Sequence, residues 1–162
     1  MIDSHLLKLR RRHDIGAAEE SAIRAAIRDV RRVGPDAMII PAGKHLDEST
    51  LLIDGWLARV KELQSGVRQF TELHVAGDFA DLHSFTLKRL EHDVVSLTAS
   101  TIASVPHKAL RELTERHSHL ARVYWFQTNL DASIHREWTV CMARRSAPAP
   151  GNRRSSRRSG RC

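Results

Sequence analysis

The spacing of apolar residues along this chain changes once, near Pro106. Before Pro106, short apolar segments are separated by turn-forming residues, a pattern typical of an antiparallel β-roll or barrel. The stretch 57–75 predicts a hairpin with Ser65-Gly66 at its turn. The predicted strand segments are 37–40, 51–63, 67–75, 94–99 and 101–105.

Helical periodicity appears at both ends of this region. Residues 17–32 place Ile23, Ile27 and Val30 on one face and predict a short N-terminal helix. After Pro106 the pattern predicts a short helix over 107–115 and a long one over 119–145, which contains no Gly or Pro. The predicted fold class is therefore α+β and mainly β: an antiparallel β-roll or jelly roll with a short N-terminal helix and a long C-terminal helix.

The predicted long helix has two neighbouring apolar stripes. One stripe can dock on the roll while the other meets a second copy of the chain, which makes this helix a dimerisation element and predicts a homodimer. A single wide face that packs on one core is the alternative. The predicted interface residues are Leu120, Tyr124, Gln127, Asp131, Ile134, Trp138 and Cys141.

The distribution of charge changes near residue 144, well after the change in apolar spacing at Pro106. Residues 144–162 contain seven Arg and no acid, so the other 19 of the 26 basic residues balance all 19 acids. The net charge of +7 therefore belongs to the tail, which we expect to be disordered and to bind nucleic acid only non-specifically. The predicted boundaries are 1–106 for the N-terminal helix and roll, 107–145 for the two later helices, and 146–162 for the tail.

Several classes of protein are excluded by composition. No apolar run approaches the roughly 20 residues of a membrane span, and the N-terminus lacks the apolar core of a secretory signal. Two cysteines, Cys141 and Cys162, form no disulfide framework, which favours a reducing cytoplasm. We find no nucleophile–base pair and no phosphate-binding glycine loop, so we expect no enzymatic activity.

The order of these elements, together with several short motifs, resembles the sensor half of Crp/Fnr-type bacterial transcription regulators. The likeness covers roughly residues 5–147. The motifs are Gly55-Trp56-Leu57-Ala58-Arg59, Ser65-Gly66-Val67-Arg68-Gln69, Ala76-Gly77-Asp78-Phe79, Asp81-Leu82-His83-Ser84-Phe85, Val94-Val95-Ser96-Leu97-Thr98, His135-Arg136-Glu137-Trp138 and Arg144-Arg145-Ser146-Ala147.

This resemblance implies a cyclic-nucleotide-binding-domain fold that dimerises through the long helix and leads into a helix-turn-helix domain. Binding members of the family use a Gly-Glu pair for the ribose and an Arg-Ser/Thr-Ala triplet for the cyclic phosphate. Here those positions fall on Asp81-Leu82 and on Leu90-Glu91-His92. Leu82 accepts no hydrogen bond and Glu91 repels phosphate, so we expect no cofactor; a cyclic nucleotide is the one possibility, which these departures argue against.

An unknown small-molecule effector would then lie between Gly77 and Arg89, against residues 124–131 of the long helix. The residues expected to line its site are Asp81, His83, Ser84, Lys88 and Arg89.

The tail stands where the resemblance calls for the DNA reader. Pro148 and Pro150 break any continuing helix. We therefore expect a truncated or frame-shifted regulator, which binds DNA specifically only in a form that carries the helix-turn-helix domain.

Histidine is frequent enough to raise the question of a metal. The tightest group is His74, Asp78, Asp81 and His83, with His74, Asp81 and His83 as the weak candidate ligands of one site. Ordinary strand-end and turn roles explain these residues better than a metal site does, and we expect no metal. The leading interpretation is the sensor and dimerisation domain of a Crp/Fnr-type regulator. The alternatives are a ligand-free module that forms mixed dimers with full-length regulators, and a small jelly-roll metalloprotein.

Overall fold

The computed structural model of this protein describes residues 2–146 and is built mainly of antiparallel strands. In that range the strands are β1 (Arg28–Val33), β2 (Met38–Ile40), β3 (Glu48–Asp54), β4 (Trp56–Glu62), β5 (Arg68–Val75), β6 (Asp93–Ser96) and β7 (Ser100–Pro106). The helices are α1 (Asp3–Arg10), α2 (Ala17–Ala26), α3 (Ser84–Leu87), α4 (His107–Arg116) and α5 (Ser118–Ser146). The predicted fold class, a β-roll with a short N-terminal helix and a long C-terminal helix, is confirmed.

Two antiparallel sheets form the roll. One has the strand order β1-β7-β3 and the other β2-β6-β4-β5. Their inward side chains make one apolar cluster, whose fully buried members include Leu52, Leu57 and Val94. Burial of these side chains drives the two sheets together because it removes apolar surface from water.

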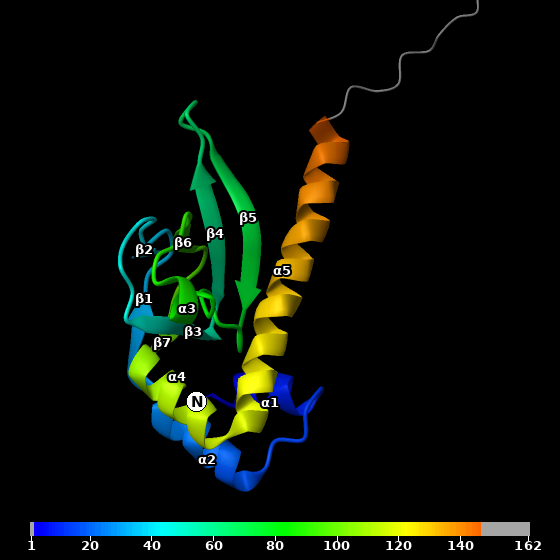
Figure 1. Cartoon of the computed structure of the whole chain (residues 1–162). Coiled ribbons are helices and arrows are strands. Elements are labelled where there is room, and N and C mark those ends of the chain that lie inside the picture. Colours follow the sequence, from blue (N-terminus) through cyan, green and yellow to red (C-terminus); the bar gives the residue numbers. More distant parts are fainter. Residues whose placement is uncertain (1, 147–162) are drawn as a thin grey trace, which may run out of the picture.

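A second apolar cluster joins the roll to the helices. Figure 1 shows α1, α2 and α4 gathered at one end of the roll, with α5 rising from them beside the β4–β5 hairpin. Leu6 and Leu9 of α1, Leu110 of α4 and Leu120 of α5 meet in this cluster. Helix α1, which the sequence pattern did not predict, therefore contributes fully buried side chains to the core.

The predicted helix over 17–32 is correct only in its first part. Helix α2 ends at Ala26, Ile27 is extended, and residues 28–33 form the edge strand β1 against β7. Val30 is 42% exposed and therefore belongs to no buried helix face. Pairing of the backbone with β7 outweighs the local helical period, since an edge strand gains its hydrogen bonds from a distant segment.

The hairpin and the two C-terminal helices agree with their predictions. Strands β4 and β5 pair from Trp56–Val75 to Glu62–Arg68, with Gly66 in the left-handed region at the turn. The predicted segment 51–63 divides into β3 and β4 at Gly55, where a side chain would collide with Ser100.

Helix α5 differs from its prediction in how its first turns are used. Leu120 and Tyr124, both predicted at a dimer interface, pack into the core of their own chain, so they cannot also form the surface that meets a partner. The predicted tail lies outside the described residues from position 147 onward. No described helix has the length and apolar character needed to cross a membrane.

Gly77 fixes the position of α1 on the roll. Its φ of +93° is a left-handed conformation, and a Cβ there would lie 2.8 Å from the carbonyl oxygen of Ser4. The Gly77 carbonyl also lies 2.8 Å from Nδ1 of the buried His5. The close approach of the two backbones therefore requires glycine at this position.

We expect Gly77→Ala to lower the free energy of unfolding at least twice as much as Gly66→Ala. Gly66 has a similar φ of +78°, but its Cβ would meet nothing within 4 Å. Gly66→Ala should therefore cost only the left-handed penalty of about 1–2 kcal/mol, whereas Gly77→Ala must also displace α1. Urea unfolding of both variants measures this difference, and equal losses would contradict the proposed role of Gly77.

Candidate functional site

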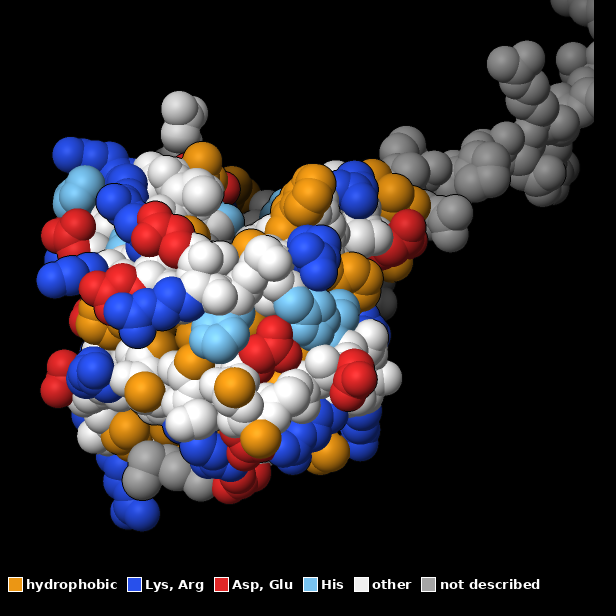
Figure 2. Space-filling view, turned by 60° about the horizontal axis from the view of Figure 1, so that its bottom comes forward, with side chains coloured by type: hydrophobic (Ala, Val, Ile, Leu, Met, Phe, Trp, Pro, Cys, Tyr) orange, Lys and Arg blue, Asp and Glu red, His pale blue; other side chains and the backbone are white. Residues whose placement is uncertain are grey.

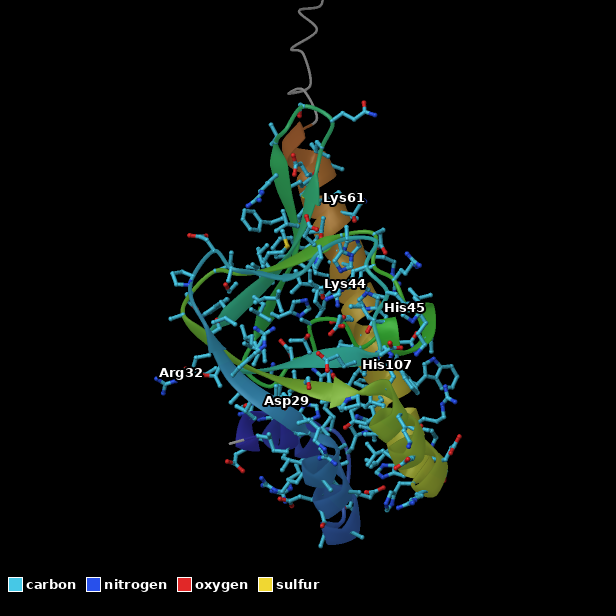
Figure 3. The ribbon with its side chains drawn as sticks, turned by 90° about the vertical axis from the view of Figure 1, so that its left-hand side faces the viewer. Asp29, Arg32, Lys44, His45, Lys61 and His107 are labelled. Carbon is cyan, nitrogen blue, oxygen red and sulfur yellow. The ribbon has the colours of Figure 1, made fainter. Side chains whose placement is uncertain are left out.

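A cavity of about 540 Å³ lies between the four-stranded sheet and α5. Strand β4, the loop before β6 and the middle of α5 supply its walls. Figure 3 labels Lys61 on the β4–β5 hairpin, and its side chain belongs to the cavity lining. Its lining is mostly polar and ionisable and consists of Arg59, Lys61, Thr71, His83, Glu91, His92, Thr128, Asp131, Ala132, His135 and Arg136.

Arg59 is the central residue of the cavity wall and is only 6% exposed. Its guanidinium donates to the Glu72 carboxylate on β5 and, over 2.6 Å, to Asp131 on α5. Its Nε and Nη2 also donate to the Ala80 carbonyl over 3.0 and 2.8 Å. One side chain thus connects β4, β5, the loop before α3 and the long helix.

Burial and charge shift the ionisation of the groups around Arg59. Burial and, to a lesser extent, the Arg59 cation lower the pKa of His83 to about 4. The same two causes lower the pKa of His92, whose ring lies 5.6 Å from that of His83. The pKa of Glu72 is raised to about 8, because burial and the Asp131 carboxylate together outweigh the opposing effect of the Arg59 cation. The imidazoles of His83 and His92 are therefore neutral at physiological pH.

A comparison with known families identifies the domain that holds this cavity. Residues 30–117 match the cyclic nucleotide-binding domain, and this match covers more than half of the chain. The chain belongs to the cyclic nucleotide-binding domain family. The resemblance to the sensor half of Crp/Fnr-type regulators is thereby confirmed at the level of the domain.

Solved structures of the same fold include bacterial regulators. The cyclic nucleotide-binding domain from Methylobacillus flagellatus KT has a TM-score of 0.76 and 14% identity, with 91% of this chain and 85% of that chain covered. The c-di-GMP-responsive regulator CLP of Xanthomonas campestris has a TM-score of 0.69 and 16% identity, with coverage of 80% and 64%.

The catabolite activator protein of Thermus thermophilus has a TM-score of 0.66 and 15% identity, with 83% of this chain and 62% of that chain covered. The match therefore spans less than two thirds of each of these two regulators. No curated protein matched the sequence.

Of the five residues predicted to line an effector site, His83 is the one that borders the domain's large cavity. It also borders a second, mainly apolar cavity of about 480 Å³ between α3, α4 and α5. Arg89 points elsewhere and donates to the Gly43 carbonyl over 2.8 Å.

Asp81, Ser84 and Lys88 form a separate polar network. Asp81 is fully buried and accepts from the Thr50 amide over 2.6 Å and from the Ser84 hydroxyl over 2.9 Å. The Lys88 ammonium donates to Nδ1 of His107 over 2.9 Å, so Nε2 of His107 carries the proton that faces Ser84, 3.2 Å away. Figure 3 shows His107 where β7 passes into α4. This network joins β3, α3 and α4. Its polar groups form hydrogen bonds with one another and do not line the cavity.

The prediction from sequence missed Arg59, Lys61, His92 and His135 as cavity residues. Arg59 left the clearest signal, because it stands among Leu57, Ala58 and Val60 in a strand whose middle is buried. A charged residue in such a strand needs buried partners. The partner on α5, however, is 72 positions away and has no local signal.

The ligating groups around His74 also differ from those expected. The predicted candidates were His74, Asp81 and His83, but Asp81 is engaged with Thr50 and Ser84. Within the described residues the structure brings His74 together with Glu72 and Asp131, with one potential ligand atom from each lying within 4.8 Å of the others.

Figure 2 shows that Lys/Arg and Asp/Glu side chains are mixed on the face formed by the lower end of the molecule, with histidines near its middle. This face therefore carries no broad area of one sign. The mixture agrees with the balance of charges along residues 1–143.

We expect His83→Gln to remove part of the acid sensitivity of the domain. In the folded state the pKa of His83 is about 4, below its usual 6.5, so between these values the unfolded chain binds more protons. The free energy of unfolding contributed by this residue should fall as pH drops from 6.5 to 4, by at most about 1.4 kcal/mol per pH unit.

Urea unfolding of the wild type and of His83→Gln at several pH values measures the contribution. The stability of the wild type relative to the variant should decline steadily with acidification. A difference that stays constant from pH 7 to pH 4 would show that His83 is not held neutral by the fold.

Proposed function

We propose that this domain is the sensor of a Crp/Fnr-type transcription regulator and that it binds a small anionic effector between the roll and α5. The cavity of about 540 Å³ is the observation that supports this proposal most directly, because it is large enough for a nucleotide-sized ligand and is bordered by the long helix.

The charges around the cavity favour an anion. Arg59, Lys61 and Arg136 supply positive charge from two elements, and Glu91 and Asp131 supply negative charge. Asp131 is already paired with Arg59, and Glu91 lies at the rim. Among the described residues Arg136 makes no ion pair, so its guanidinium is available for a carboxylate or phosphate.

We expect the effector to be a molecule other than cAMP or cGMP, because the family's usual contacts to these nucleotides are missing. Leu82, at a position expected to meet the ribose, is buried in the apolar core and points no polar atom at the cavity. Glu91, at a position expected to meet the phosphate, brings negative charge to the cavity wall. The regulator CLP responds to c-di-GMP. A different anionic nucleotide is therefore a reasonable class of effector for this domain.

The Arg59–Asp131 ion pair offers a route from the cavity to α5. An effector that draws Arg59 toward itself would weaken the pair and free the middle of the helix from the sheet. Ligand binding would then shift the balance between two dispositions of α5, since a ligand stabilises the state that it binds more tightly.

We also propose that α5 pairs with α5 of a second copy. Its exposed apolar residues include Trp125, Ile134 and Val140, which are 70%, 43% and 46% exposed. Gln127, Ile134 and Cys141 are spaced by seven residues, as in the seam of a two-stranded coiled coil. These three residues, with Trp138, remain the predicted interface, whereas Asp131 is paired with Arg59 of its own chain.

An anionic effector should raise the melting temperature of the wild type, since a ligand that binds only the folded state stabilises it. The panel should contain cAMP, cGMP, c-di-GMP and linear nucleotides. We expect no shift with cAMP or cGMP and a shift with at least one other anion.

Arg136→Gln should weaken that binding about tenfold or more, because it removes one charge-assisted contact. Arg122→Gln, on an exposed position of the same helix and outside the cavity lining, should leave it unchanged. Equal loss in both variants, or no shift with any anion, would refute an anion site in this cavity.

The proposed helix pair can be tested by oxidation. In Cys162→Ser, the exposed Cys141 is the single remaining cysteine, and two copies paired along α5 should form a disulfide-linked dimer. Adding Ile134→Glu should abolish both the covalent dimer and the dimer seen by analytical ultracentrifugation, because two buried carboxylates would face each other. Covalent dimers that persist with Ile134→Glu would argue against this pairing.

A further inference from the structure

Three metal-ligating side chains converge beside the cavity, and the proposed effector site does not use them as a group. Glu72 and His74 lie two residues apart on β5, so they share one face of the strand. Asp131 approaches them from α5, which brings one potential ligand atom from each residue within 4.8 Å of the others. Glu72 and His74 are each 1% exposed, so the group lies inside the protein.

Arg59 by itself does not satisfy all the polar groups of this cluster. Two carboxyl groups, Glu72 and Asp131, face one guanidinium, so ionising both would leave an excess of negative charge in a buried place. Nε2 of His74 is buried and has no hydrogen-bond partner among the described residues. A buried polar nitrogen without a partner is costly, and a cation beside it would satisfy both the imidazole and the second carboxylate.

The donor set selects a class of cation. One imidazole nitrogen and two carboxylate oxygens suit Zn²⁺ and neighbouring divalent transition metals. Ca²⁺ and Mg²⁺ prefer oxygen donors throughout, and the cluster includes no thiolate for softer ions. Two positive charges would balance the two carboxylates.

The side chains need only small movements to close on an ion. Tetrahedral Zn²⁺ with bonds of about 2.0 Å places its ligand atoms about 3.3 Å apart, compared with the 4.8 Å within which these atoms now lie. The Arg59 guanidinium would have to leave, and it already borders the cavity of about 540 Å³, where Glu91 also lies.

We propose that Glu72, His74 and Asp131 bind one divalent transition-metal ion, with Zn²⁺ the best chemical fit, and that Arg59 turns into the neighbouring cavity when the ion binds. The metal and the guanidinium are then alternative cations for the same two carboxylates. The ion would fasten α5 to β5 and leave one coordination position open toward the cavity. The proposal does not depend on the anionic effector, which is tested by nucleotides and Arg136.

The test uses the full chain freed of metal by chelator and titrated with Zn²⁺ and with Co²⁺. We expect one equivalent of Zn²⁺ to bind and to raise the melting temperature, and one equivalent of Co²⁺ to give visible d–d absorption. His74→Gln and Asp131→Asn should each weaken Zn²⁺ binding at least tenfold, because each removes one of three ligands.

His45→Gln is the matched control, since His45 is exposed and lies outside the cluster. It should bind Zn²⁺ like the wild type. Circular dichroism establishes that each variant folds, and Asp131→Asn, whose side chain is 26% exposed, is the milder change. Failure of the wild type to bind an equivalent of Zn²⁺, or equal affinity in the wild type and in Asp131→Asn, would overturn the proposal.

Discussion

The buried guanidinium of Arg59 is the constraint on which the arrangement of the roll and the long helix depends. It pairs with Glu72 across the β4–β5 hairpin and with Asp131 on α5, and it holds the Ala80 carbonyl. Removing one partner of such a buried network leaves an uncompensated buried charge. The loss of stability would then affect the packing of every element that the network joins. The middle of α5 therefore cannot move relative to the sheet unless Arg59 also changes its partners.

This constraint places the candidate effector cavity and the metal-ligating cluster on the two sides of one side chain. Arg59 lines the cavity, and Glu72 and Asp131 belong to the cluster. An anion in the cavity would attract Arg59, and a cation in the cluster would repel it. Both events would bias the same ion pair in the same direction. The two proposed ligands would thus both act on the position of α5 through one charge, that of Arg59.

The domain keeps the fold of its family at low sequence identity. Structures with only 14–16% identity superpose on it over most of its length. The apolar clusters that hold the roll together need only side chains of suitable volume and pattern, so they tolerate such divergence. Recognition of a ligand needs particular groups at particular points, and Leu82 and Glu91 stand where the family resemblance leads us to expect polar contacts.

Local signals in the sequence determined the parts of the fold that depend on neighbouring residues. Turn chemistry at Ser65-Gly66 determined the hairpin, and the uninterrupted helical stretch after His119 determined α5. The helical pattern of residues 17–32 wrongly predicted a helix beyond Ala26. Residues 28–33 instead form strand β1, which obtains its hydrogen bonds from β7, about seventy residues later. Tertiary structure alone decided that Asp131 meets Arg59 and that His74 meets Glu72 and Asp131. Those contacts join residues far apart along the chain, and no local pattern records which distant charge will neutralise a buried one.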